Sequence, residues 1–356
     1  MNKPTMQQIA EQLSTSRITV WKALNNRPGV SDQKRREIFE AASQMGYFAH
    51  SASLPPAEPA SRARTVAVVV SRPESSLFWM QILHQLAKEF SALNVNLMYT
   101  YIHVDGPSSL VLPASLSDGS VDGMIVMNVY SAQVLRQLSS LALPKVFLDT
   151  VPALPFPQLS GDLVLIEGYN SIRQITSQLL ELGLRRLCFV GDIAYAQTNA
   201  DRYHGFLDAF ADYGLQADPG LCLTQSLELA THFEQISSFL ESLRVTPDAI
   251  ICASDFLAHF VERYYSEHHL PREGRIVLTG FDDSDEYANV AGRITTVAVQ
   301  TDLLGSRLAA RLAFRLDHPD AWPELSYVRT KVIYRNLPGK LPAAKSAAPA
   351  LNSAGR

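Results

Sequence analysis

The stretch that decides the fold is "TMQQIAEQLSTSRITVWKALNNRPGVSDQKRREIFEAASQMGY", residues Thr5 to Tyr47. Apolar residues recur in it at the i, i+3, i+4, i+7 spacing of amphipathic helices, in three short blocks. A residue able to cap a helix precedes each block, namely Thr5, Ser16 and Ser31, and Gly46 ends the last one. The stretch therefore predicts three short helices that share a small core.

The first two predicted helices and the tight turn between them have the length of a helix-turn-helix, in which the second helix enters the DNA major groove. Arg17 and Ile18 start the second helix, where side chains reach base edges, and Trp21 and Lys22 follow one turn later on the same face. Arginine commonly reads guanine, isoleucine can contact a thymine methyl, and Lys22 can reach a guanine or a phosphate. Helical spacing alone also fits a protein-contact module with a solvated charged face, so this alternative stays open.

The charge is distributed unevenly along the chain. The 356 residues carry a net charge of −4, but the first 50 contain seven Lys or Arg against four Asp or Glu. The N-terminal segment is therefore the basic end, whereas the remainder is acidic.

A chain of this length exceeds what one hydrophobic core usually supports, so several domains are expected. We assign residues 1–49 to the helical domain and residues 50–64, "HSASLPPAEPASRAR", to a Pro-, Ala- and Ser-rich linker. We expect residues 65–338 to form a long two-lobed domain and residues 339–356, which have few large apolar side chains, to form a disordered tail.

The long domain repeats a strand-then-helix pattern. Continuous apolar runs without alternation predict strands buried on both faces of a parallel sheet, and the helical patterns between them predict a doubly wound α/β fold. Binding crevices in such folds lie at the carboxyl ends of the strands, so we expect a ligand cleft between two lobes. The strand-like runs are 65–70, 121–127, 145–149, 185–191, 248–254 and 275–281, and the helical patterns include 172–182, 203–213 and 256–268.

Several classes of protein and site are disfavoured. The three cysteines, Cys188, Cys222 and Cys252, are too widely spaced for a metal knuckle or a CxxC pair, so we expect reduced, buried thiols. The N-terminus lacks the apolar core of a signal peptide, and no run approaches the roughly 18 apolar residues of a membrane span. We therefore expect a cytoplasmic protein with no membrane partner.

Enzyme and metal signatures are also missing. The sequence has no GxSxG elbow, P-loop or HExxH, and no GxGxxG after a strand. The acidic run 282–286 lacks the glycine and closing glutamate of an EF-hand loop, so a solvated turn is the better interpretation. We expect no enzyme activity, no metal site and no cofactor.

Residues 5–47 resemble the DNA-binding headpiece of the lactose-repressor (LacI/GalR) family of bacterial transcription regulators. The resemblance implies that Arg17, Ile18 and Lys22 read bases. It also implies that operator DNA is a partner and that phosphates are contacted by Thr5, Ser16, Thr19 and Asn25. The matching positions are Thr5, Ile9, Ala10, Leu13, Ser16, Thr19, Val20, Leu24, Asn25, Pro28, Gly29, Val30, Ser31, Met45, Gly46 and Tyr47.

Two departures from the family pattern stand out. Trp21 replaces a small serine, so an indole whose Nε1 can donate to a phosphate, pack on the backbone or pack on the third helix takes the place of a hydroxyl. Family members usually follow the headpiece with a hinge helix whose leucine enters the minor groove. Here Leu54 lies early and runs into Pro55 and Pro56, which disfavours such a helix.

The α/β region resembles the same family more loosely, as far as about residue 336. The segments "ADRYHGFLDAF" (200–210), "ASDFLAHF" (253–260), "LTGFDDSDE" (278–286) and "ITTVAVQTDLLG" (294–305) carry the likeness. It implies the fold of periplasmic sugar-binding proteins, with a small effector in the cleft, and a homodimer that presents two recognition helices to a near-palindromic operator.

By the same resemblance, Arg202 clamps effector oxygens through its planar fork, and Asp149 and Asp282 accept hydrogen bonds from hydroxyls. Ser254 supplies a further polar contact, and an aromatic pair supplies a flat apolar wall, which makes a sugar or polyol the expected effector. Other interpretations stay open: the two aspartates can cap turns, Arg202 can pair on its own helix with an aspartate, and the aromatic rings can be core. The aromatic pair is Phe78 and Trp79.

The sequence thus predicts a DNA-binding transcriptional regulator, a repressor, whose operator binding is controlled by a sugar-like effector. The alternative is a small-molecule binding protein or α/β enzyme whose N-terminal helices serve protein contacts.

Overall fold

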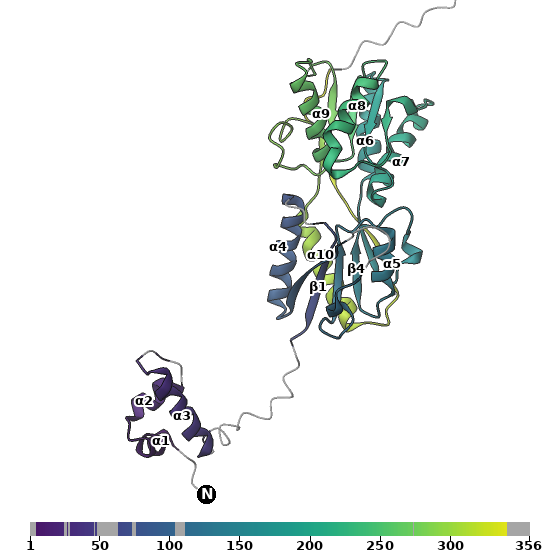
Figure 1. Ribbon diagram of the computed structural model, residues 1–356. Coiled ribbons are helices and arrows are strands. Elements are labelled where there is room, and N and C mark those ends of the chain that lie inside the picture. The colour runs from purple at the N-terminus through teal and green to yellow at the C-terminus, as the bar shows by residue number, and fades with distance from the viewer. Residues whose placement is uncertain are drawn as a thin grey trace, which may run out of the picture. The chain divides into compact units, whose positions relative to one another are not determined.

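The computed structural model describes residues 5–24, 27, 29–45, 47, 63–72, 76–103, 111–272 and 274–339. It divides into two compact units, Met1–Ala63 and Arg64–Arg356, which are described here one at a time (Figure 1). Asn25, Leu54 with the two prolines after it, most of the linker and the tail after Gly339 lie outside the described residues.

Three helices form the N-terminal unit: α1 (Met6–Gln12), α2 (Arg17–Leu24) and α3 (Asp32–Gln44). The predicted caps are confirmed. Thr5 forms a reciprocal capping box with Gln8, Ser16 Oγ accepts from the Thr19 N–H at 3.0 Å, and Ser31 Oγ accepts from the Lys34 N–H at 3.3 Å. The buried core of this unit consists of Ile9, Ala10, Val20, Ala23, Ile38, Ala41 and Ala42.

Arg35 ties α3 to the end of α2. Its Nη1 donates to the Ala23 carbonyl at 3.0 Å, and its Nη2 donates to the Arg27 carbonyl at 2.9 Å. The last carbonyls of a helix lack intrahelical partners and carry partial negative charge, so a guanidinium stabilises them. The side chain of Arg35 thereby fixes the direction of α2 against α3, a role that sequence analysis did not assign.

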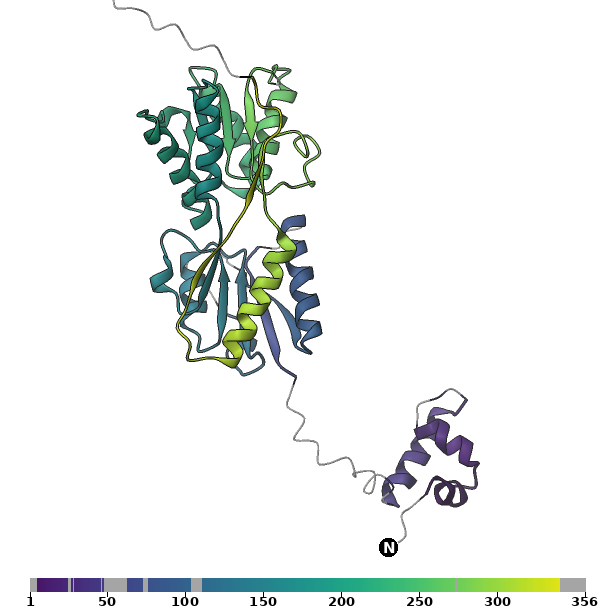
Figure 2. The ribbon, with the colours of Figure 1, turned by 180° about the vertical axis from the view of Figure 1, so that it is seen from behind.

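The N-terminal lobe of the second unit is a parallel sheet in the order β11-β5-β4-β3-β1-β2. Helices α4 and α10 lie side by side on one face of the sheet, and α5 lies on the other (Figures 1 and 2). The strands are β1 (Thr65–Val70), β2 (Asn96–Tyr101), β3 (Gly123–Met127), β4 (Lys145–Leu148), β5 (Asp162–Ile166) and β11 (Leu325–Val328), and the helices are α4 (Leu77–Ala92), α5 (Ala132–Ser140) and α10 (Thr301–Asp317).

The C-terminal lobe is a second parallel sheet, in the order β7-β6-β8-β9. Helix α6 packs against α7, and α8 packs against α9. The strands are β6 (Leu187–Val190), β7 (Cys222–Leu223), β8 (Ala249–Cys252) and β9 (Val277–Thr279), and the helices are α6 (Tyr169–Glu181), α7 (Gln197–Asp212), α8 (His232–Ser242) and α9 (Asp255–Glu267). The predicted doubly wound parallel sheets are therefore confirmed.

The chain crosses between the lobes at three places. It leaves β5 for α6, returns from β10 (Thr296–Ala298) to α10, and leaves β11 for β12 (Lys331–Ile333), which pairs antiparallel with β10. Figure 2 shows the last two of these crossings between the lobes. Because three separate backbone segments join the lobes, each lobe contains segments that are far apart in sequence.

Two expectations from composition are resolved by the described residues. Cys188 and Cys252 are buried free thiols, but Cys222 is only half-buried, because it begins the short edge strand β7. The prediction that all three are buried is therefore wrong for Cys222. No helix in the described part of the chain is long and apolar enough to cross a bilayer.

Close packing of α6 on α7 generates a prediction about Gly205. A Cβ at this position would lie 2.1 Å from the Tyr169 carbonyl oxygen, which belongs to the backbone and cannot move aside. Gly205→Ala should therefore force the helices apart and lower the free energy of unfolding by about 1–3 kcal/mol. Thermal unfolding would show a Tm loss of several degrees. Gly339→Ala, where a Cβ meets nothing within 4 Å, is the control, and an equal Tm for the two variants would contradict the packing argument.

Candidate functional site

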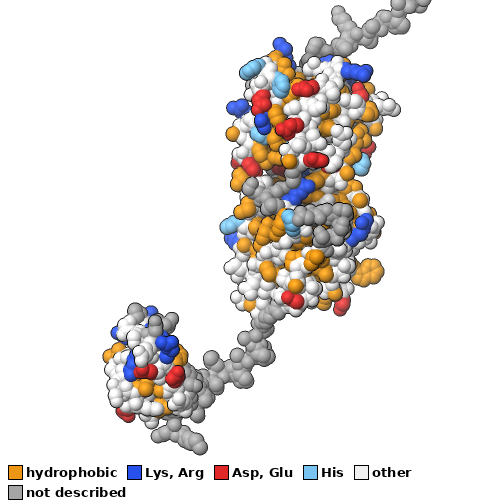
Figure 3. Space-filling view, in the orientation of Figure 1, with side chains coloured by type: hydrophobic (Ala, Val, Ile, Leu, Met, Phe, Trp, Pro, Cys, Tyr) orange, Lys and Arg blue, Asp and Glu red, His pale blue; other side chains and the backbone are white. Residues whose placement is uncertain are grey.

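The outer face of α2 carries the residues that sequence analysis assigned to DNA. Arg17 is exposed, Ile18 is 67% exposed and Trp21 is 44% exposed, while Val20 and Ala23 on the opposite face are buried in the helical core. Thr19 and Lys22 are half-buried. Lys and Arg side chains are visible on this unit in Figure 3. Arg17 and Ile18 are therefore accessible to a partner, whereas Asn25 lies outside the described residues.

The predicted phosphate ligands cluster at helix starts. Ser16 Oγ lies 2.8 Å from Thr19 Oγ1, so these two hydroxyls share a hydrogen bond at the N-terminus of α2. Thr5 Oγ1 occupies the equivalent position at α1, where it accepts from the Gln8 N–H. Helix N-termini carry partial positive charge and favour phosphate groups, so the placement suits the expected contacts. The contacts themselves stay predictions.

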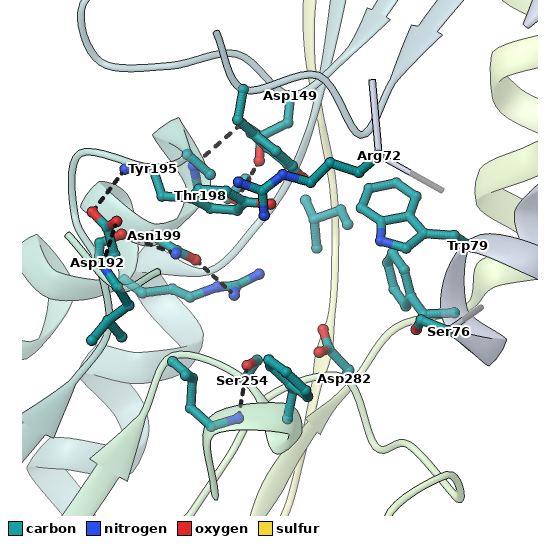
Figure 4. Close-up of a pocket in the computed structure, with 18 of the residues that line it drawn as sticks. Arg72, Ser76, Trp79, Asp149, Asp192, Tyr195, Thr198, Asn199, Ser254 and Asp282 are labelled. Atoms are coloured by element: carbon teal, nitrogen blue, oxygen red, sulfur yellow. Dashed lines mark hydrogen bonds between the residues drawn. The ribbon is translucent and has the colours of Figure 1, made fainter. Parts of the chain in front are cut away.

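The second unit has a cavity of about 530 Å³ where the carboxyl ends of its two sheets face one another. All six predicted effector-binding residues line it, although they come from different strands and helices of both lobes (Figure 4). Sequence analysis missed the others: Arg72, Ser76, Tyr130, Leu148, Ile166, Asp192, Tyr195, Ala196, Thr198, Asn199, Leu227, His232, Phe256, Leu257, Glu286 and Tyr287. Some of these could have been found, because Arg72 and Tyr130 follow predicted strands.

Arg202 on α7 is held rigidly beside the cavity. Its Nη1 donates to the Ala253 carbonyl, and its guanidinium carbon lies 3.6 Å from the centre of the Phe281 ring. It is 6% exposed, and burial lowers the pKa of its guanidinium, with the nearby carboxyl of Asp282 as the largest opposing influence. It donates to neither of the helix aspartates that the alternative interpretation invoked, so that alternative is wrong. A Cβ at Gly168 would lie 2.7 Å from the Arg202 side chain, so glycine is required there.

Asp149 joins the two lobes. It follows β4 in the N-terminal lobe at φ 69°, and its carboxylate accepts hydrogen bonds from the Thr198 hydroxyl at 2.5 Å and the Thr198 N–H at 3.4 Å. Thr198 begins α7 in the opposite lobe, whose own N-cap residue, Ala196, offers no side-chain acceptor. Burial raises the pKa of Asp149 to about 6 despite these hydrogen bonds. Asp149 thus caps a helix of the other lobe rather than the helix that follows its own strand, and its part in effector binding stays a prediction.

The reciprocal contact occurs at α4. Glu286 of the C-terminal lobe accepts from the Leu77 N–H of the N-terminal lobe at 3.1 Å. The N-cap residue of α4, Ser76, forms no side-chain hydrogen bond to its helix. Each lobe thus supplies a carboxylate to an otherwise uncapped helix N-terminus of the other, where negative charge is stabilising.

Asp282 lies after β9 at φ 114°, a conformation that side-chain-bearing residues seldom adopt. Its carboxyl makes no hydrogen bond to a described residue and lines the cavity. Burial raises the pKa of Asp282 to about 8, and the guanidinium of Arg202 only partly opposes this effect. At neutral pH Asp282 is therefore largely protonated and can donate as well as accept a hydrogen bond.

Phe78 and Trp79 form an edge-to-face pair, with ring centres 5.1 Å apart, at the start of α4. Both are half-buried, pack against the main core and line the cavity, so neither ring belongs to the core alone or to the cavity alone. Ser254 caps α9 by accepting from the Leu257 N–H at 3.2 Å, which leaves its hydroxyl hydrogen available to the cavity. Within the described residues, no three His, Cys, Asp or Glu side chains are grouped as metal ligands.

The raised pKa of Asp282 predicts a pH-dependent stability. The folded state binds this proton more tightly than the unfolded state, whose carboxyl has a pKa near 3.8. The stabilisation is therefore complete at low pH and is lost as pH rises toward 8. Between about pH 6 and pH 8 wild type should lose roughly 1–3 kcal/mol that Asp282→Asn does not lose.

Tm measured across this pH range for both proteins checks the prediction, with Asp285→Asn, an exposed carboxyl of the same turn, as the control. Parallel Tm profiles for wild type and Asp282→Asn would contradict it.

Comparisons with known proteins agree with this architecture. Residues 176–336 match the model of the periplasmic binding protein-like domain. The chain is 23% identical over 334 residues to the HTH-type transcriptional regulator RegA of Clostridium saccharobutylicum, covering 91% of this chain and 96% of RegA. It is 24% identical over 341 residues to the HTH-type transcriptional regulator CelR of Thermobifida fusca, covering 94% and 98%.

Solved structures show the same fold. A CelR–cellobiose complex is similar with a TM-score of 0.64 and 21% identity, covering 94% of this chain and 99% of that one. A lac repressor dimer bound to operator and an anti-inducer gives a TM-score of 0.63 and 18% identity over the same shares. The regulators to which the chain is related are not enzymes. The chain thus combines a helix-turn-helix unit with a two-lobed periplasmic-binding-protein-like unit. Along nearly its whole length it is similar to HTH-type transcriptional regulators, and it has the fold of the lac repressor.

Proposed function

We propose that this protein is a transcriptional repressor that binds operator DNA as a homodimer and changes its DNA affinity when a sugar or polyol occupies the cleft. The observation that carries the proposal is the 530 Å³ cavity, lined from both lobes by Arg202, Asp149 and Asp282, in a chain whose α2 exposes Arg17 and Ile18. The site of action is the cytoplasm, where operator DNA would be found.

The solved relatives support the ligand and partner classes. The CelR complex contains cellobiose, and a LacI family regulator from Enterococcus faecium, similar with a TM-score of 0.63, contains ribose. The lac repressor structure is a dimer on its operator. Direction of control depends on which lobe arrangement the effector prefers, since a ligand shifts a conformational equilibrium only by its differential affinity.

Within the headpiece, Arg17, Ile18 and Lys22 are the proposed base-reading residues, and the hydroxyls at the starts of α1 and α2 are the proposed phosphate ligands. Trp21 is proposed to contact the sugar-phosphate backbone. Within the cleft, Arg202 would donate paired hydrogen bonds to effector oxygens, Asp149 and Asp282 would bind hydroxyls, and the Phe78–Trp79 pair would stack on the C–H face of a ring.

The effector would act through the contacts that join the lobes. Asp149 lines the cavity and also caps α7, so a hydroxyl that binds its carboxylate competes with Thr198. Altered lobe closure would then change the positions of α4 and α10, which pack on one another along the N-terminal lobe. Movement of α4 and α10 would carry the change in lobe closure from the cleft along the length of the N-terminal lobe.

The DNA-reading role predicts the effect of Arg17→Ala. Loss of one paired contact to guanine should weaken specific binding by about 1–3 kcal/mol, or roughly 5- to 150-fold. A gel-shift titration of the full chain on its own upstream DNA measures this, with Arg244→Ala, an exposed arginine of the C-terminal lobe, as the control for lost charge. Sequence-specific, salt-sensitive retardation is expected for wild type. Its absence at low salt would contradict the proposed function.

Trp21→Ser separates the two roles open to the indole. If the ring contacts the DNA backbone, the substitution should weaken binding to all sequences by a similar factor, measurable in the same gel-shift titration at several salt concentrations. Unchanged affinity and salt dependence would restrict Trp21 to packing within the headpiece.

Arg202→Lys tests the cleft. Lysine keeps the charge but loses the planar fork and the stack on Phe281, so effector affinity should fall about tenfold or more while DNA binding without effector is retained. Thermal-shift screening with sugars and polyols identifies the effector, because a ligand bound to the folded state raises Tm. An unchanged Tm increase in the variant would remove Arg202 from the effector site.

A further inference from the structure

Arg72 is a second guanidinium at the cavity, and sequence analysis did not single it out. It follows β1 in the N-terminal lobe and lines the cavity. Its guanidinium carbon lies 4.6 Å from the centre of the Tyr195 ring, which belongs to the opposite lobe. In Figure 4 its side chain extends from the side of Trp79 toward Asp149 and Thr198. The Arg72 guanidinium is therefore positioned over the cavity.

Stacking holds this guanidinium in a defined plane. Tyr195 itself lies against Tyr130 of the N-terminal lobe, with ring centres 4.0 Å apart, so the surface under Arg72 is braced from both lobes. An arginine that stacks by its face keeps the N–H donors along its edge for other acceptors. The stack therefore orders Arg72 without using its hydrogen-bonding capacity.

No carboxylate of the described cavity wall pairs with Arg72. Four acidic side chains line the cavity, and three of them accept hydrogen bonds from other groups, whereas Asp282 makes no hydrogen bond to a described residue and burial raises its pKa. Arg202, the other guanidinium, donates to Ala253 and Asn199 and forms no ion pair with another described residue. The engaged acids are Asp149 on Thr198 and Thr150, Asp192 on the N–H groups of Ala194, Tyr195 and Leu227, and Glu286 on Leu77.

Two guanidinium groups from opposite lobes thus line one cavity, and neither forms an ion pair with an acidic side chain among the described residues. Arginine donates paired hydrogen bonds to carboxylate and phosphate groups with matching geometry, and these charge-assisted bonds are stronger than neutral ones. A neutral sugar would leave Arg72 without a directly paired anion in a partly desolvated site, whereas an acidic group could form that pair.

We propose that the effector is a polyhydroxyl compound with one acidic group, either a phosphate or a carboxylate, which Arg72 binds. This inference rests on the proposed function and specifies the ligand class of its cleft. The acidic group would lie on the Arg72 side of the cavity, while the hydroxyls would reach the aspartates and the aromatic pair.

The test measures binding of matched compounds to the full-length protein by calorimetry. The probes are glucose, galactose and mannose, the 6-phosphate of each and the uronic acid of each, which separate phosphate from carboxylate recognition. At least one acidic probe should bind wild type tenfold or more tightly than its neutral parent. Arg72→Gln should remove that advantage, Arg72→Lys should retain part of it, and Arg244→Gln should leave it unchanged.

Three results would overturn the inference. The first is that neutral sugars bind with the same affinity as the acidic probes. The second is that Arg72→Gln weakens the binding of neutral and acidic probes equally, because Arg72 only braces the lobes. The third is that no probe binds. Gel-shift titration of the same preparations separates this failure from a failure of the proposed function. Specific DNA retardation would leave the regulator proposal standing, and its absence would remove both.

Discussion

The arrangement of the two lobes in the second unit depends on the hydrogen bonds that the Asp149 carboxylate accepts from Thr198. Asp149 ends a strand of one lobe and caps the first turn of α7 in the other, while Glu286 makes the converse contact with α4. Neither helix has a side-chain cap from its own N-cap residue, so each N-terminus has its carboxylate partner only when the lobes lie together. Asp149 and Glu286 therefore line the cavity and also hold the lobes together. A ligand that hydrogen-bonds to the Asp149 carboxylate would compete with its contact to α7 and so affect how the lobes close.

Polar residues in strained backbone conformations concentrate at this edge. Asn128, Asp149 and Asp282 each follow a strand and each have positive φ, at 54°, 69° and 114°. Such conformations cost about 1–3 kcal/mol and persist where the surrounding structure enforces them, as at binding sites. Parallel strands bring their carboxyl ends to one edge. Asp149 and Asp282, although far apart in sequence, therefore both line the cavity, while the buried Asn128 amide donates to the Arg72 carbonyl.

Much of the fold could be predicted from the sequence, for identifiable physical reasons. Continuous apolar runs marked β1, β3, β4, β6, β8 and β9, because strands buried on both faces need no alternation. The pattern failed for β2 and β11, whose exposed residues include Tyr99 and Tyr327, and for the two-residue β7. Edge strands face solvent on several sides, so their composition resembles that of loops. Strand β5, "DLVLI", is fully buried and would have fitted the same rule.

The cleft was predicted less completely, because the contacts that define it join residues with no local signal. Arg202, Asp149 and Asp282 could be picked by resemblance, but pairing of Asp149 with Thr198 or of Glu286 with Leu77 depends on how two lobes close. Arg72 also carried no sequence signal of a binding site. In the sequence it is a single charged residue after a strand, and such residues are usually exposed to solvent. The observation behind its proposed role is its position over the Tyr195 ring in the cavity wall, and that position depends on tertiary contacts that no sequence pattern shows.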